Sequence, residues 1–336
     1  MSVRLLETLD EQIEHLCLKI ILLQTSYSGF LTVNQTYNNS LFFWFFPAQS
    51  KAFAAPLVLW LQGGPGWPSM YGLFKENGPY LIGWDDQAAK PALLKNIYSW
   101  TQNHNMLYID NPAGTGFSFS QYQNGLPQTD EQIGLELLEA LRQFMLLYPY
   151  MISGVDASQT PVYAFGESYG GAYVVSLAHV YLHMRENNKD FIKNIMLKGL
   201  GIGNGFVAPE YQSIYAEYVN SITYLTEKQN ETMSRFDHST LQAIREGQDK
   251  SAQDTSNRAL HYFATEIMNL TNIYDFTHDS SNNFLTNHEY VCYLQDPKVR
   301  RAIHAGNAKF HSGKIQFSYF RKMNEFILFD RSDIFP

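Results

Sequence analysis

The chain has 336 residues, of which 45% are hydrophobic, 15% aromatic and only 17% charged, with a formal net charge of −8. This composition supports one large core or two modest ones and excludes long disordered tracts. The acidic balance argues against nucleic acid as a partner, because a phosphate backbone is bound by clustered Lys and Arg. No apolar run reaches the roughly 20 residues that a membrane helix needs. The composition therefore predicts a soluble protein without a membrane span.

The N-terminal segment, residues 1–26, is atypical of a secreted protein. Its apolar run Leu16–Leu23 is interrupted by Lys19 and follows an acidic stretch, whereas a signal peptide begins with basic residues. We find no convincing signal peptide here and expect the true start of the protein to be missing or misassigned. The two cysteines, Cys17 and Cys292, can form at most one disulfide, and the sequence leaves open whether they do.

Four triplets match the acceptor pattern for N-glycosylation, beginning at Asn34, Asn38, Asn230 and Asn269. A single match of this kind arises easily by chance. Four together favour passage through the secretory route.

The first half of the chain alternates strand-like and helix-like segments. Strands are predicted at 28–46 (a hairpin turning at Asn38-Asn39), 56–62, 105–110, 161–165 and 195–203, and helices at 129–148 and 172–184. Such alternation is typical of a mostly parallel α/β sheet, which we place in residues 27–208. Residues 209–295 are more polar and mostly helical, and we interpret them as a cap inserted over the sheet. Residues 296–336 return to the core through a capped helix at 296–305 and a strand-like run at 325–329.

The sequence Gly166-Glu167-Ser168-Tyr169-Gly170 matches G-x-S-x-G, the pattern of a nucleophile elbow. Five residues alone are weak support, but here a strand-like segment precedes them and a helix-like segment follows. Strand, glycine-flanked serine and helix form the context that this motif requires. The glycines are needed because a β-carbon would clash in so sharp a turn.

Three segments that end strands carry further motifs, Trp60–Gly66, Asp110–Ser118 and the elbow itself. Sites in open α/β sheets form beyond the carboxyl ends of strands, so we expect these segments to converge. Together they resemble the serine carboxypeptidases, a family of α/β-hydrolase fold. The segments at 28–33, 201–205 and 299–304 fit this family as well, and Gln62 resembles its vitellogenic-carboxypeptidase-like branch.

The resemblance implies a serine-type carboxypeptidase, a peptidase that releases C-terminal residues from peptides or proteins, without cofactor or metal. Ser168 would be the nucleophile that forms an acyl-enzyme. The N–H groups of Tyr169 and Gly64 would stabilise the oxyanion. Gln62, Glu76 and Glu167 would bind the free carboxylate of the substrate. Because two neighbouring carboxyls cannot both ionise cheaply, we expect one raised pKa and tighter substrate binding at acidic pH.

The family's triad also requires an aspartate and a histidine, the latter in a Gly-His-x-x-Pro loop, and neither is identified here. None of the ten histidines follows a glycine. His304, His311 and Asp333 are poor matches to these roles, so we expect the chain to be C-terminally truncated and weakly active or inactive. A second departure is Trp67-Pro68, where the family has small residues, and it could displace the oxyanion loop.

Two alternatives remain beside a hydrolase. A catalytically inactive homologue could bind peptide C-termini in a regulatory role, and the missing histidine favours this hypothesis. An acyltransferase would use the same acyl-enzyme but would need the same missing base. A generic esterase or lipase is disfavoured, because a neutral ester does not call for the carboxylate-binding set. Side-chain preference and oligomeric state are not indicated by the sequence, and a secreted or lysosomal location is what the family implies.

Overall fold

The computed structural model describes residues 24–85, 90–149, 160–223, 225–270, 274 and 289–312. The chain divides into two compact units. The first contains Met1–Gly205 and His288–Gln316, and the second contains Phe206–Asn287 and Phe317–Pro336. The features named above at Leu16–Leu23, Cys17, 325–329 and Asp333 lie outside the described residues.

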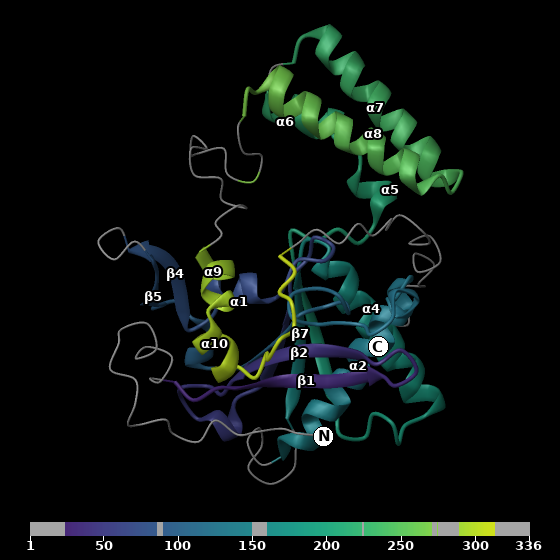
Figure 1. The fold of residues 1–336 in the computed structure, drawn as a ribbon. Helices are drawn as coiled ribbons and strands as arrows, with labels where there is room; N and C mark the ends of the chain where they lie inside the picture. The colour runs from purple at the N-terminus through teal and green to yellow at the C-terminus, as the bar shows by residue number, and fades with distance from the viewer. Residues whose placement is uncertain are drawn as a thin grey trace. The chain divides into compact units, whose positions relative to one another are not determined.

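The first unit is built on a six-stranded sheet with the order β1-β2-β6-β3-β7-β8 (Figure 1). Its strands are β1 (Tyr27–Asn34), β2 (Asn39–Phe46), β3 (Leu57–Leu61), β6 (Asn105–Ile109), β7 (Pro161–Glu167) and β8 (Met196–Gly203). β1 and β2 form the predicted antiparallel hairpin, and β2 is antiparallel to β6. The neighbours β6, β3, β7 and β8 are all parallel, so the predicted mostly parallel sheet is confirmed.

Helices α2 (Asp130–Leu147) and α4 (Gly170–Asn187) pack together on one face of this sheet (Figure 1). The side chain of Thr129 caps the start of α2 by accepting a backbone N–H, as its sequence position suggests. Gly134 of α2 approaches α4 so closely that a β-carbon would stand 2.6 Å from Ser176 Oγ. The contact between the helices therefore requires glycine at this position.

Strand β2 lies between two covered faces. All eight of its residues are buried, and successive side chains point to opposite sides. Phe43 and Phe45 pack against Phe144 of α2, with ring centroids 5.7 and 5.0 Å apart. Trp44 and Phe46 belong to the core on the other face. An uninterrupted apolar run is what such a strand needs.

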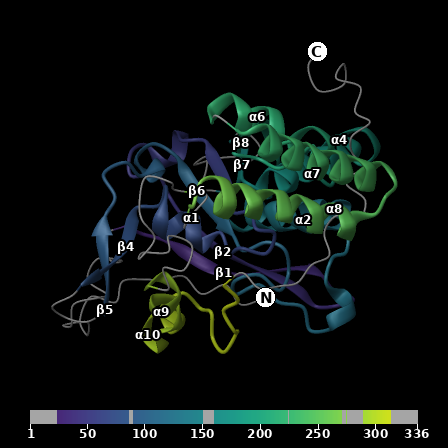
Figure 2. The ribbon, with the colours of Figure 1, turned by 90° about the horizontal axis from the view of Figure 1, so that it is seen from above.

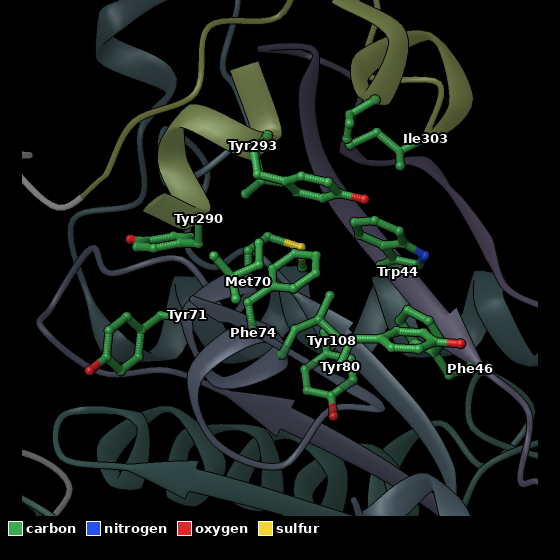
Figure 3. Packing of buried hydrophobic residues seen from close by; sticks show 14 of the residues in the cluster. Trp44, Phe46, Met70, Tyr71, Phe74, Tyr80, Tyr108, Tyr290, Tyr293 and Ile303 are labelled. Carbon is green, nitrogen blue, oxygen red and sulfur yellow. The ribbon is translucent and has the colours of Figure 1, made fainter. Parts of the chain in front are cut away.

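The second face is covered by α1 (Met70–Lys75), α9 (Glu289–Gln295) and α10 (Pro297–Ala302). Figure 3 shows the tyrosines of α9 over the side chains of α1. The ring of Tyr293 lies 5.5 Å from that of Phe74, and the ring of Tyr290 lies 5.8 Å from that of Tyr71, both nearly perpendicular. Residues separated by more than 200 positions thus share one core. In the view of Figure 2, α9 and α10 again lie side by side.

Several elements differ from the sequence analysis, which names neither α1 nor the hairpin of β4 (Tyr80–Asp85) and β5 (Lys90–Lys95). Each has only six residues, too few to display a clear period. The predicted helical insertion extends to residue 295, whereas α9 groups with the first unit because its tyrosines enter the core there.

The second unit is helical. It contains α5 (Pro209–Gln212), α6 (Ala216–Ile222), α7 (Glu227–Arg245), α8 (Asp249–Tyr262) and a π-helical turn, η6 (Phe263–Ile267). Val219, Met233 and Ala259 form its buried centre. Asp237 of α7 accepts hydrogen bonds from the first N–H groups of α6, which secures the start of that helix.

Candidate active site

Ser168 lies at the turn between β7 and α4. Its φ of 57° falls in the left-handed region, which residues other than glycine rarely adopt. The turn is held by hydrogen bonds from Ser168 N–H to Gly203 O (2.9 Å) and from Gly171 N–H to Ser168 O (3.0 Å). A β-carbon at Gly166 would overlap Gly170 O. This strained strand–turn–helix has the geometry expected of a nucleophile elbow.

The loop after β3 runs directly beside the elbow. A β-carbon at Gly63 would stand 2.5 Å from both Glu167 O and Tyr169 N, and 2.8 Å from Ser168 Cβ. Gly64 follows with a φ of 109° and is exposed, and its N–H has no acceptor among the described residues. The structure therefore brings the predicted oxyanion loop against the predicted nucleophile. The role of the Gly64 and Tyr169 N–H groups in an oxyanion hole stays a prediction.

Gln62, Glu76 and Glu167 meet beside the elbow. Gln62 Nε2 donates to Glu76 Oε1 at 3.3 Å and to Glu167 Oε1 at 3.1 Å. Gln62 follows β3, Glu76 follows α1 and Glu167 ends β7, so three elements supply one cluster. The structure thus joins the three residues that the resemblance assigns to carboxylate binding.

Both carboxyl groups of this cluster resist ionisation. Burial, followed by the charge of Glu167, raises the pKa of Glu76 from 4.5 to about 8. Burial also raises the pKa of Glu167, while hydrogen bonds from Glu76 and Gln62 oppose that rise. At neutral pH the pair therefore holds a proton. The raised pKa expected from the sequence is found here.

Two aromatic residues that the sequence analysis does not assign to the site border this cluster. Trp60 Nε1 donates to Gln62 Oε1 at 3.1 Å, so both amide hydrogens of Gln62 face the carboxyls. Burial and then the charges of Glu76 and Glu167 raise the pKa of Tyr71, which places its hydroxyl near the pair. Trp60 could have been found from its position two residues before Gln62, on the same strand face. Nothing in the sequence marks Tyr71.

The third predicted segment, Asp110–Ser118, supports the site from the core. Asp110 is fully buried, which raises its pKa to about 7, and its Oδ2 accepts from Phe117 N at 3.0 Å. Ser69 joins this segment to the cluster, because its hydroxyl donates to the last carbonyl of β6 and accepts from Gln62 N. The segment therefore fixes the backbone at Gln62.

The sequence model of the serine carboxypeptidase family matches residues 19–329. This chain belongs to the serine carboxypeptidase family. The resemblance inferred from the motifs is thereby confirmed, and the α/β-hydrolase fold with it.

Curated serine carboxypeptidases resemble the chain over most of its length. Probable serine carboxypeptidase CPVL of Homo sapiens is 38% identical over 311 residues, covering 88% of this chain and 61% of that protein. Venom serine carboxypeptidase of Apis mellifera is 38% identical over 292 residues (85% and 60%). Vitellogenic carboxypeptidase of Aedes aegypti is 34% identical over 297 residues (85% and 58%). The chain thus spans about three fifths of the length of these relatives.

A solved carboxypeptidase shares the fold. The prohormone-processing carboxypeptidase KEX1(delta)P of Saccharomyces cerevisiae superimposes with a TM-score of 0.67 at 22% identity, covering 86% of this chain and 66% of that one. At this identity the likeness establishes the architecture alone.

Neither His304 nor His311 is hydrogen-bonded to Ser168. His311 exchanges two backbone hydrogen bonds with Gly116, at 3.0 and 2.8 Å. His304 follows α10 with a φ of 58°. Within the described ranges no imidazole is hydrogen-bonded to the Ser168 hydroxyl.

The glycosylation candidates differ in accessibility. Asn38 and Asn269 are exposed, whereas Asn34 and Asn230 are half-buried. Asn34 Oδ1 also accepts from the N–H groups of Thr36 and Tyr37, which forms a local turn. Asn38 and Asn269 are therefore the better placed acceptors. Among the described residues, no helix has both the length and the apolar character needed to cross a membrane.

Proposed function

We propose that this chain carries the nucleophile and the carboxylate-binding set of a serine-type carboxypeptidase, which removes C-terminal residues from peptides or proteins. The observation that supports this most is the Gln62–Glu76–Glu167 cluster beside the elbow. An exopeptidase must recognise a free carboxylate, and a cluster that keeps a proton at neutral pH can donate a hydrogen bond to it.

In the proposed reaction Ser168 Oγ attacks the last peptide carbonyl. The O–H bond of the serine breaks, a base takes the proton, and the carbonyl oxygen becomes an oxyanion. The N–H groups of Gly64 and Tyr169 would stabilise that oxyanion. Collapse of the intermediate breaks the C–N bond, the proton held by the base passes to the leaving nitrogen, and the terminal residue departs with a free amine. Water then hydrolyses the acyl-enzyme and restores the Ser168 hydroxyl.

The 336 residues by themselves are proposed to turn over slowly, since no histidine here has the expected Gly-His-x-x-Pro setting. Removing the triad histidine costs about 10⁶ in kcat in a serine protease. The second candidate function is accordingly a non-catalytic peptide-binding or regulatory homologue. The same cluster supports it, because binding a carboxylate needs no base.

Binding to paired ligands tests both candidates. We expect the chain to bind an N-benzoyl dipeptide acid saturably and to bind the corresponding amide at least about 10-fold more weakly, by loss of a charge-assisted contact. Hydrolysis that disappears in Ser168→Ala would establish the peptidase. Acid-selective binding without turnover would establish the binding homologue. Equal affinity for acid and amide would overturn both.

The proposed location is the secretory route, ending in secretion or the lysosome. The exposed acceptors Asn38 and Asn269 support it. Treatment with an N-glycosidase should lower the mass of the protein. The variant that carries both Asn38→Gln and Asn269→Gln should show no such decrease. A protein from the same cells with no glycan at any of the four acceptors would contradict the assignment.

A further inference from the structure

The backbone bends sharply after α1, where Glu76 leaves the helix. The φ of Glu76 is −127° and its ψ is −86°, which fits neither a helix nor a strand. The N–H groups of Glu76 and Asn77 both donate to Gly72 O, at 3.2 and 3.0 Å. Asn77 is also anchored to the core, because its Oδ1 accepts from the hydroxyl of Tyr108 at 2.8 Å. The bend therefore determines where the Glu76 side chain emerges.

Asn96, which follows β5, holds the carbonyl groups on both sides of Asn77. Its side-chain amide donates to Glu76 O at 3.0 Å and to Gly78 O at 2.9 Å. Its Oδ1 accepts from Tyr98 N at 2.9 Å. Asn96 is only 5% exposed, so water competes little for these bonds. Both amide hydrogens and the amide oxygen are engaged, and the side chain is thereby fixed in one orientation.

Little else holds the Glu76 carboxyl beside Glu167. The ion pairs among the described residues involve neither carboxyl. The groups that face Glu76 are the carboxyl of Glu167 and the hydroxyls of Tyr71 and Tyr108, none of which is positively charged. Burial without a cation favours movement of a carboxyl out to water, and the bond from Gln62 is long at 3.3 Å. A backbone that cannot shift is therefore what retains the Glu76 carboxyl in the cluster.

We propose that Asn96 is a positioning residue of the carboxylate-binding set. By holding the backbone on both sides of Asn77, it keeps the Glu76 carboxyl against Gln62 and Glu167. The hairpin of β4 and β5 thereby becomes part of the support of the site, since Asn96 directly follows its second strand. This inference rests on the proposed function, because it requires that the Glu76 carboxyl helps to bind the terminal carboxylate of a peptide.

The test measures binding in the full chain with Ser168→Ala, so that no substrate is consumed. The probes are an N-benzoyl dipeptide acid and the matching amide, titrated calorimetrically between about pH 5.5 and about pH 9. We expect Asn96→Ala to weaken binding of the acid about 10-fold at the lower pH and that of the amide less than about 2-fold. The pH at which acid binding fails should also fall by about one unit, because a Glu76 carboxyl that reaches water loses its proton more readily.

Asn105→Ala is the matched control. Asn105 is fully buried, and its amide donates to Ala52 O and Ala55 O at 2.8 and 2.9 Å. Its Oδ1 accepts from Ala48 N at 2.9 Å. Asn105 thus makes the same kinds of bond as Asn96, but at the start of β6, whereas the cluster lies at the opposite ends of the parallel strands β3 and β7. Both variants should lower the midpoint of urea unfolding, and only Asn96→Ala should change the acid-to-amide ratio and the pH profile.

Two further variants show whether Asn96 acts through Glu76. In Glu76→Ala the carboxyl is absent, so adding Asn96→Ala should weaken acid binding less than about 2-fold further. Asn96→Ser keeps one hydroxyl donor and should show a smaller loss in the same direction as Asn96→Ala. It takes the place of Asn96→Ala if that variant does not fold.

An unchanged acid-to-amide ratio and pH profile in the Asn96 variants would mean that Asn96 only stabilises the fold, and would overturn the inference. Equal effects of Asn96→Ala and Asn105→Ala on the ratio would overturn it too, as would an undiminished effect of Asn96→Ala in the Glu76→Ala background. Equal affinity of the Ser168→Ala parent for acid and amide would instead overturn the proposed function, and the inference with it.

Discussion

Gly63 touches the elbow so closely that a β-carbon on it would stand 2.8 Å from Ser168 Cβ. The same β-carbon would lie 2.5 Å from Tyr169 N. Contacts this short do not occur in folded proteins, so a β-carbon at Gly63 would force its neighbours to move. Those neighbours are the backbone atoms of the elbow and the Cβ of Ser168, which cannot shift easily. Gly63 therefore sets the distance between the loop and the nucleophile.

We predict that Gly63→Ala lowers the free energy of unfolding by about 2 kcal/mol or more, as overpacking against backbone does. Urea denaturation followed by tryptophan fluorescence measures this. Gly203→Ala is the matched control, because a β-carbon there meets nothing within 4 Å. Similar losses in the two variants would show that the contact at Ser168 is unimportant.

Peptide binding should depend on pH through the Glu76–Glu167 pair. The pKa of Glu76 is about 8, and the carboxylate of a peptide is ionised from about pH 5 upward. Affinity for an acid-ended peptide should be full between about pH 5 and pH 7 and fall by about tenfold per pH unit above pH 8, where the proton of Glu76 is lost. Glu76→Gln cannot lose this proton and should flatten the profile. A Glu76→Gln titration with the same slope above pH 8 as the parent would rule out this account.

Stability should also fall as the pH rises, because of Glu136 in α2. Burial raises its pKa from 4.5 to about 7, although a hydrogen bond from Asn39 Nδ2 at 2.6 Å opposes the rise. The folded state therefore holds this proton more tightly than the unfolded state. The resulting stability is complete below pH 4.5 and is lost as the pH rises through 7.

Glu136→Gln removes the buried charge and keeps an acceptor for Asn39. We expect the variant to be more stable than the parent by about 2 kcal/mol at pH 8 and nearly equal to it at pH 4. Glu186→Gln, at an exposed position of α4, is the control and should leave the pH dependence intact. A Glu136→Gln difference that is the same at both pH values would argue against a buried ionisation.

Helix α7 begins with a reciprocal cap. The Thr226 hydroxyl accepts from Gln229 N at 3.3 Å, and Gln229 Oε1 accepts from Thr226 N at 2.9 Å. Thr226→Ala should destabilise the second unit by about 1 kcal/mol, with Thr226→Ser close to the parent. Thermal unfolding by circular dichroism distinguishes the variants. No difference between Ala and Ser would mean that the cap contributes nothing.

Local signals predict much of this chain. The hairpin 28–46, the helix 129–148 and the strand–Ser168–helix segment each have a clear hydrophobic periodicity and residues that mark where the element begins or ends. The structure confirms all three. The meeting of Gln62, Glu76 and Glu167 is different. Nothing local unites residues separated by up to 105 positions, and only the family pattern predicted their cluster.

Contacts made across the chain could not be predicted in this way. Tyr71 enters the site because α1 turns it toward Glu76 and Glu167, and a six-residue helix shows too little period to reveal this. The packing of α9 in the first unit depends on Tyr290 and Tyr293 finding a surface more than 200 residues away. Such contacts join residues that are distant in the sequence, so no short stretch of sequence predicts them.

Helix α9 is synthesised long after the core that it covers. The aromatic face of the sheet is complete in sequence once Phe117 has been synthesised, but Tyr290 and Tyr293, which cover it, follow much later. At about 5–20 residues per second, translation of the intervening stretch takes on the order of ten seconds or more. During that interval a nascent chain that had folded its sheet would still expose Trp44, Met70 and Phe74, which α9 has not yet covered. A ribosome-bound chaperone that recognises aromatic surface would find a target in these side chains.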